Sequence, residues 1–430
     1  MKSPDVATRT TISASPQTAL VDEPFALTVQ GAAPGERVTI SSRLVDDAGH
    51  AWAASVTYRA DRNGRVDVTR DAPEPGGSYD GVEPMGLVWS LRPDSDEAGN
   101  PMLFRRRLDP LQLQVEARTE SGATTATTLE RQSIAAGVRR TEVRDSGLVG
   151  TLFEPASQNA PAVITLSGSG GGLSESLAAL FASRGFATLA LGYFAMPGLP
   201  DELKSIPLEY FETAMKWLDA RDGIRGERVG VVGASRGGEL ALLLGATFPQ
   251  VGAVVSYAPS ALVYGGLGRT AGPPGPAWLH RGEAVPYFTS SRPPAPFPEK
   301  PSGPIPLTPG FLKGLEDKDA VERALIPVER IKAPVLLVSG DADQMWPSSR
   351  YADMVMRRLR EHGHAYPDQH LAYPDAGHTL NFPYVPTTVL ASKHPLTGHV
   401  FAYGGTPQGQ ARAREDSWPK VLAFLRDALR

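Results

Sequence analysis

The pattern of hydrophobic and polar positions changes its period once along the chain. From about residue 21 to residue 131, apolar residues alternate with polar ones, as in the run Phe25, Leu27 and Val29. Residues typical of turns separate these runs at short intervals. Such alternation is typical of antiparallel strands that bury one face. The first part of the chain is therefore predicted to be a β-sandwich.

The remainder of the chain shows short apolar runs that alternate with segments of helical spacing, which predicts a mostly parallel sheet covered by helices. We therefore expect two domains, an immunoglobulin-like β-sandwich over residues 10–135 and an α/β-hydrolase domain over residues 136–430. The strands expected in the second domain are 163–166, 187–191, 229–232, 253–257, 335–338 and 370–373, and the expected helices are 173–184, 208–220, 239–248 and 349–359.

One segment fits neither pattern, because residues 271–310 hold 12 of the 39 prolines of the chain. So many prolines exclude a long helix or a central strand. We predict an excursion over the active site, with outer bounds 262–312. Its aromatic residues could line an apolar channel or could be incidental to a surface loop. These residues are Trp278, Tyr287, Phe288 and Phe297.

Composition narrows the functional classes. The formal charge is −4, from 43 basic and 47 acidic residues, which argues against a nucleic-acid-binding surface. The chain has no cysteine, so disulfides, thiolate metal sites and a cysteine nucleophile are excluded. No apolar run approaches the roughly 18 residues of a membrane span, and no secretory signal precedes the first domain. We therefore expect no membrane span and a cytoplasmic protein.

The segment Gly233-Ala234-Ser235-Arg236-Gly237 has the pattern of a nucleophile elbow. It follows a β-branched apolar run and precedes a helical segment rich in leucine and alanine. A chain that turns from strand to helix so abruptly strains the serine, and glycines are needed where main chain passes close by. Ser235 is therefore the predicted nucleophile of an acyl-transferring enzyme.

The partners of such a serine follow in the order acid, then histidine. Asp343 follows the expected strand 335–338, and we prefer it to Asp341 because it stands three residues past Gly340. His378 follows the last expected strand, where its imidazole can reach back over the serine. The predicted catalytic residues are thus Ser235, Asp343 and His378.

Acyl transfer also needs backbone donors for the developing oxyanion. The amide of Arg236 is expected to supply one, and Ser169, or else Gly170, the second. The run Ser167-Gly168-Ser169-Gly170-Gly171-Gly172 does not fit a phosphate-binding loop, because Leu173 stands where a dinucleotide fingerprint needs its third glycine. No metal site is expected, since the two aspartates near residue 342 lack the further ligands of a calcium loop.

With these elements placed, the chain resembles the acyl-CoA thioesterase and bile acid-CoA:amino acid N-acyltransferase family over nearly its whole length. The resemblance implies a serine, histidine and aspartate triad that acts on an acyl-CoA thioester without a metal or redox cofactor. The matching segments are Val21-Asp22-Glu23-Pro24, 77–87, 168–173, 233–240, Ile326-Pro327-Val328-Glu329-Arg330 and 340–346.

The residue at the elbow bears on which acceptor takes the acyl group. Family members with cysteine there pass it to an amino acid, whereas those with serine mainly hydrolyse, so Ser235 implies a thioesterase. Arg236 stands where the family commonly has lysine. This arginine, with Arg269, Arg281 and Arg292, could meet CoA phosphates or could simply be solvated.

Several alternatives stay open at this stage. The enzyme could pass its acyl group from a CoA or carrier-protein thioester to an amine or alcohol, or hydrolyse a thioester of an acyl carrier protein or an oxoester. A serine peptidase is disfavoured because no propeller repeat precedes the catalytic part. A noncatalytic binding protein would require a broken triad. The acyl chain, the oligomeric state and the role of the proline-rich segment are not determined by the sequence.

Overall fold

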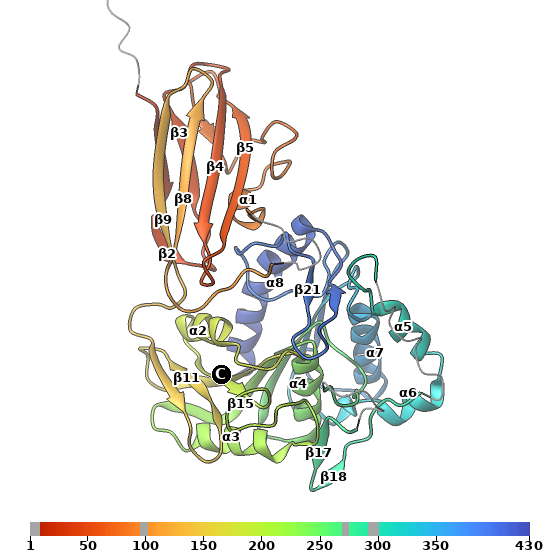
Figure 1. The fold of residues 1–430 in the computed structure, drawn as a ribbon. Helices are drawn as coiled ribbons and strands as arrows, with labels where there is room; N and C mark the ends of the chain where they lie inside the picture. Colours follow the sequence, from red (N-terminus) through yellow and green to blue (C-terminus); the bar gives the residue numbers. More distant parts are fainter. Residues whose placement is uncertain (1–8, 95–101, 269–274, 291–300) are drawn as a thin grey trace, which may run out of the picture. The chain divides into compact units, whose positions relative to one another are not determined.

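The structure is a computed structural model that describes residues 9–94, 102–268, 275–290 and 301–430. The chain divides into two compact units, which Figure 1 shows in the colours of the sequence. The described residues of the first unit are 9–94, 102–133 and Pro383–Val389, and the second contains Ile134–Phe382 and Leu390–Arg430.

The first unit is a β-sandwich, as the alternating pattern predicts. One sheet has six strands in the order β2-β9-β8-β4-β5-β7, and the other has three in the order β1-β3-β6. In β8, every second residue is buried, so one face of the strand builds the core. The elements are β1 (Thr11–Ser15), β2 (Thr18–Leu20), β3 (Ala26–Gln30), β4 (Arg37–Val45), β5 (Ala51–Arg59), β6 (Val66–Asp67), α1 (Gly86–Trp89), β7 (Arg92–Pro93), β8 (Leu111–Thr119) and β9 (Thr124–Gln132).

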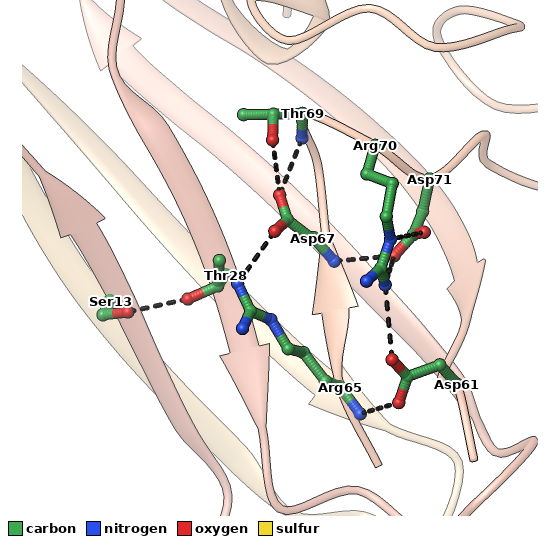
Figure 2. A network of polar contacts seen from close by, with 8 residues as sticks. All are labelled: Ser13, Thr28, Asp61, Arg65, Asp67, Thr69, Arg70 and Asp71. Atoms are coloured by element: carbon green, nitrogen blue, oxygen red, sulfur yellow. Dashed lines mark hydrogen bonds and ion pairs between the residues drawn. The ribbon is translucent and has the colours of Figure 1, made fainter. Parts of the chain in front are cut away.

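A polar network ties the turns around β6 together (Figure 2). Asp67 accepts hydrogen bonds from the backbone and hydroxyl of Thr69 and from Arg65. Arg70 pairs with Asp71 and reaches Asp61 at 3.3 Å. The hydroxyl of Thr69, with the other donors, lowers the pKa of Asp67. The strand β6 is the shortest of the three-stranded sheet and makes few hydrogen bonds to its neighbour. These side chains provide further contacts around it.

A distant segment completes the first unit. Thr387 donates its backbone N–H to the Trp89 carbonyl at 3.0 Å, and the hydroxyl of Thr388 donates to the Leu91 carbonyl at 2.6 Å. The predicted division assigned all of residues 136–430 to the hydrolase domain. The structure differs, because Pro383–Val389 packs with the first unit through contacts that no local pattern encodes.

The second unit is built on an eight-stranded sheet in the order β10-β11-β13-β12-β15-β16-β19-β20. In this order, the strands from β13 to β20 run parallel to one another, whereas β11 pairs with β13 in the antiparallel direction. All six expected strands are present, whereas the antiparallel pair β10 and β11 was not predicted. The strands are β10 (Arg139–Val143), β11 (Val149–Glu154), β12 (Ala160–Leu166), β13 (Ala187–Gly192), β15 (Ile224–Ala234), β16 (Val251–Tyr257), β19 (Val335–Gly340) and β20 (Gln369–Tyr373).

Helices pack against this sheet and bury its apolar strands, the arrangement of an α/β-hydrolase domain. Each of the four expected helices is found within a few residues of its predicted bounds. A fifth helix, α8, was not predicted. The helices are α2 (Glu175–Ser183), α3 (Glu209–Asp219), α4 (Arg236–Thr247), α7 (Ser348–Glu361) and α8 (Pro407–Ala428).

The described part of the proline-rich excursion contains short elements only. Trp278 is fully buried in the hydrophobic core, so it packs there rather than lining an open channel, and Tyr287 and Phe288 pack against that core. Phe297 lies outside the described residues. The elements of this region and its partners are β14 (Ile206–Pro207), β17 (Trp278–His280), β18 (Glu283–Ala284), α5 (Thr308–Gly314), α6 (Lys318–Ala324) and the 3-10 turn η1 (Val328–Arg330), followed by the hairpin β21 (Ala391–Lys393) and β22 (Val400–Ala402).

Candidate active site

Ser235 lies at the sharp turn between β15 and α4, with φ 58° and ψ −122°. A positive φ is a strained conformation for a residue with a side chain. The neighbouring glycines are required by space, since a Cβ on Gly233 would stand 2.0 Å from the Gly237 carbonyl oxygen. A Cβ on Gly237 would stand 2.4 Å from the Ser167 carbonyl oxygen. Ser235 therefore has the backbone geometry that a nucleophile elbow requires.

Asp343 and His378 are brought together by the ends of β19 and β20, which are neighbours in the sheet. His378 Nδ1 lies 2.9 Å from Asp343 Oδ2. The other oxygen, Asp343 Oδ1, accepts the backbone N–H groups of Met345 at 2.8 Å and Trp346 at 3.3 Å. The carboxylate is buried and fully engaged, so it can hold the imidazole in one orientation.

Asp341, the competing carboxylate, serves a different contact. It is exposed and accepts a hydrogen bond from the Ser349 hydroxyl. The choice of Asp343 over Asp341 as the partner of His378 thus agrees with the geometry.

The serine reaches the same edge of the sheet, because β15 ends two strands away from β19. Among the described residues, no hydrogen bond joins Ser235 to His378. Hydrogen bonds between catalytic groups are often long before substrate binds, so the absence of a short contact does not exclude Ser235 and His378 as partners. The structure brings Asp343 and His378 into contact and places Ser235 at the carboxyl end of the parallel strand β15, which β16 separates from β19.

Three backbone N–H groups near Ser235 have no acceptor among the described residues: those of Arg236, Ser169 and Gly170. Arg236 opens helix α4, where the first amides lack intrahelical partners. The loop that carries Ser169 approaches the elbow closely, since a Cβ on Gly168 would stand 3.9 Å from Ser235 Oγ. These amides are free to meet an oxyanion.

Several residues that support His378 were missed by sequence reasoning. Tyr403 accepts the backbone N–H of His378 at 3.0 Å through its carbonyl, and its ring lies nearly parallel to the imidazole. Trp346 meets the imidazole at a centroid distance of 5.9 Å. Helix α8 contributes Gln410 and Arg414, whose spacing of four residues on one helix face was the one available signal.

Gln410 and Arg414 hold the residues on either side of His378. Gln410 Oε1 accepts the Gly377 N–H at 2.9 Å, and its Nε2 donates to the Thr379 hydroxyl at 2.6 Å. Arg414 donates to the Thr379 carbonyl at 2.9 Å. Burial lowers the pKa of Arg414 to about 10. A buried guanidinium is costly unless it is hydrogen-bonded, and Arg414 meets this need through Thr379, the residue that follows His378.

The side chain of Arg236 does not face solvent. It is buried, and its Nη1 lies 2.8 Å from Glu239 Oε2. Its Nη2 donates to the carbonyls of Tyr264 and Gly265. This arginine is therefore not placed to meet CoA phosphates, whereas Arg281 is exposed. The other two arginines considered, Arg269 and Arg292, lie outside the described residues.

Glu239 is the acidic half of this pair and is fully buried. Its Oε1 accepts the Trp278 indole N–H at 2.9 Å and the Tyr264 amide at 3.3 Å. Burial raises the pKa of Glu239 to about 7, against the opposing charge of Arg236. The pair thus ties the excursion at Tyr264 and Trp278 to the helix that begins at the nucleophile.

The described residues lack two features of other classes of protein. No helix there combines the length and hydrophobicity needed to span a bilayer. In the same part of the chain, no three histidine, aspartate or glutamate side chains lie together as the ligands of a metal ion would. The expected absence of a cofactor stays a prediction.

The fold and the site together define an α/β-hydrolase with a serine at a nucleophile elbow, nearby backbone amides that have no acceptor among the described residues, and an aspartate-histidine pair. Residues 22–145 match the family described as "Acyl-CoA thioester hydrolase/BAAT N-terminal region", and residues 206–430 match "BAAT / Acyl-CoA thioester hydrolase C terminal". The chain belongs to this family of thioester hydrolases and acyltransferases, which confirms the resemblance seen in the sequence.

The chain is similar to curated acyl-coenzyme A thioesterases over most of its length. Acyl-coenzyme A thioesterase 1 of Mus musculus is 34% identical and aligns over 95% of this chain and 94% of its own length. Acyl-coenzyme A thioesterase 2, mitochondrial, of Mus musculus is 33% identical over 98% of this chain and 90% of its own. A solved dienelactone hydrolase-like promiscuous phosphotriesterase from metagenomic libraries is 16% identical, with a TM-score of 0.41 over 68% of this chain and 98% of its own.

Proposed function

We propose that the protein is a serine acyl-CoA thioesterase that hydrolyses an acyl-CoA to the free acid and CoA. The observation that carries this proposal is the 2.9 Å contact between His378 and buried Asp343, at the sheet edge where the Ser235 elbow also lies. The names of the relatives support an acyl-CoA substrate. The cytoplasmic location remains an expectation.

In the first half of the reaction, His378 takes the proton of Ser235 as Oγ attacks the thioester carbonyl carbon. The tetrahedral oxyanion is held by the amides of Arg236 and of Ser169, or of Gly170 in its place. The intermediate collapses, the carbon–sulfur bond breaks, and the CoA sulfur leaves with the proton from His378. An acyl ester on Ser235 remains.

In the second half, His378 takes a proton from water as the water oxygen attacks that ester. The carbon–oxygen bond to Ser235 breaks, and the serine recovers its proton from His378. Asp343 orients the imidazole throughout and stabilises its cation. The product is the free acid.

The test is a thiol-release assay over a panel of acyl-CoAs with Ser235→Ala as the control. Losing the nucleophile of such a triad costs on the order of 10⁶-fold in kcat, so the variant should release no thiol above background. Retention of more than a few percent of wild-type activity in the folded variant would overturn the serine mechanism.

An acceptor of the acyl group other than water is worth testing, because the matched family description also covers BAAT acyltransferases. Hydrolysis in H2(18)O should place the heavy oxygen in the released acid, with no conjugate when amines or alcohols are supplied. Conjugates seen by mass spectrometry would favour the acyltransferase alternative. An acyl-carrier-protein thioester, offered in the same assay, tests the other donor.

A further inference from the structure

The loop that carries Ser169 has a partner with no role in the mechanism above. His394 directly follows strand β21, in the hairpin that β21 forms with β22. Its Nε2 lies 2.9 Å from Ser169 Oγ, although the two residues are 225 positions apart in sequence. Because Ser169 is a candidate oxyanion donor, this contact joins the hairpin to the site.

The hydrogen bonds of His394 assign its tautomer. The backbone N–H groups of Leu396 and Thr397 both point to its Nδ1, at 3.3 and 3.4 Å, so this nitrogen is an acceptor. Burial lowers the pKa of His394, which favours the neutral ring. The proton of a neutral imidazole with an accepting Nδ1 sits on Nε2. His394 therefore donates to Ser169 Oγ.

This assignment excludes a second nucleophile. A serine beside a histidine can form a catalytic dyad only when the facing nitrogen is free to take the proton. In His394 that nitrogen already carries one, so Ser169 is held rather than activated. The ring is itself held from the side by Phe401, at a centroid distance of 5.9 Å.

The same hairpin contacts the next residue of the loop. A Cβ on Gly170 would stand 3.5 Å from the Pro395 side chain, so this residue lies against the hairpin too. The first residue of the loop is fixed by the buried Tyr193, whose hydroxyl donates to the Ser167 carbonyl at 2.6 Å. The glycine-rich loop is thus held at its start and in its middle, while the amides of Ser169 and Gly170 stay without an acceptor among the described residues.

We propose that His394 is a positioning residue of the reaction. Its Nε2–H holds the Ser169 side chain, so that the amides of Ser169 and Gly170 face the acyl oxygen of the thioester bound at Ser235. The inference rests on the proposed function, because a fixed oxyanion loop matters only to acyl transfer. Its effect should fall on the transition state rather than on substrate binding.

The test compares kcat and KM of the full chain for one acyl-CoA across a set of variants. His394→Ala should lower kcat about 10- to 100-fold while KM changes little, since loss of a whole oxyanion donor costs about 10²- to 10³-fold. His394→Gln, whose amide can donate from a similar position, should recover most of kcat. A purely structural role would not separate kcat from KM in this way.

Ser169→Ala supplies the second arm, because it removes the acceptor of the same hydrogen bond. If the two residues act as a unit, the double variant should be no slower than the slower single variant. His362→Ala, at an exposed histidine on the far end of α7, is the matched control and should keep wild-type kcat. Should His394→Ala fail to fold, His394→Gln and Ser169→Ala still decide the outcome.

An unchanged kcat in His394→Ala, or effects of His394→Ala and Ser169→Ala that multiply, would overturn the inference. Ser235→Ala in the same assay separates the two levels of the account. If Ser235→Ala abolishes thiol release and the His394 variants do not matter, only the positioning role fails. If Ser235→Ala retains activity, the proposed function fails, and the role of His394 fails with it.

Discussion

Arg236 Nη1 lies 2.8 Å from Glu239 Oε2, three residues further along helix α4, and both side chains are buried. The backbone of Arg236 and its side chain therefore have separate tasks. The amide is free beside Ser235, while the guanidinium links the helix to the carbonyls of Tyr264 and Gly265. Substitution of the side chain should leave the backbone donor in place.

Above pH 7, where Glu239 is ionised in the wild type, we expect Arg236→Ala to destabilise the second unit by about 3–5 kcal/mol, because it leaves a buried carboxylate without its cation. Arg236→Lys should cost less, since an ammonium can keep the ion pair but cannot reproduce the guanidinium fork. Denaturant unfolding followed by tryptophan fluorescence measures both. Equal stability of Arg236→Ala and the wild type would show that the pair contributes nothing.

The raised pKa of Glu239 predicts a pH dependence of stability. Between its ordinary value of 4.5 and about 7, the folded chain binds a proton that the unfolded chain has released. The stabilisation is therefore fully present below pH 4.5 and is lost as the pH rises through 7. The loss is on the order of 3 kcal/mol, from about 1.4 kcal/mol for each pH unit.

Glu239→Gln isolates this contribution, because an amide does not titrate. The free energy of unfolding of the wild type should fall relative to that of Glu239→Gln between pH 4.5 and pH 7. Parallel curves for the two proteins across this range would mean that Glu239 titrates normally and that burial does not raise its pKa.

Gln410 provides a test of how His378 is held. Gln410→Glu keeps an oxygen for the Gly377 N–H but loses the donor to Thr379, whereas Gln410→Ala loses both. We expect kcat to fall about tenfold or more in Gln410→Ala and less in Gln410→Glu, because small displacements of a catalytic group are costly. Steady-state kinetics give both values, and an unchanged kcat in Gln410→Ala would refute the positioning role.

The two aspartates after β19 offer a matched pair. Asp343→Asn should lower kcat by roughly 10⁴-fold, because an amide holds the imidazole in the wrong tautomer. Asp341→Asn changes an exposed group that accepts a hydrogen bond from Ser349 and makes no contact with His378 among the described residues, so its kcat should stay close to that of the wild type. Comparable losses in both variants would remove the distinction between the two carboxylates.

Local patterns predicted the parts of the fold whose hydrophobic period is strong. The parallel strands are continuous apolar runs. The predicted serine, aspartate and histidine each come after the carboxyl end of one of these strands. Helix α8 was not predicted because it buries polar residues, Gln410 and Arg414 among them, and contains Pro419. Strand β10 was not predicted because most of its five residues are polar and exposed.

The supporting contacts could not be predicted in the same way. The hydrogen bond between Ser169 and His394 depends on two loops that only the folded sheet brings together. The membership of Pro383–Val389 in the first unit depends equally on tertiary contacts. Spacing identifies residues that one strand or helix presents, but not partners that different elements supply.

The most direct test of the account is to trap the acyl-enzyme. Acid quenching of the protein during turnover of a slow acyl-CoA, followed by peptide mass spectrometry, should find the acyl group as an ester on Ser235. The Ser235→Ala variant should carry none and release no thiol. Turnover with the acyl group on another residue, or thiol release by the folded Ser235→Ala variant at more than a few percent of the wild-type rate, would contradict the central claim.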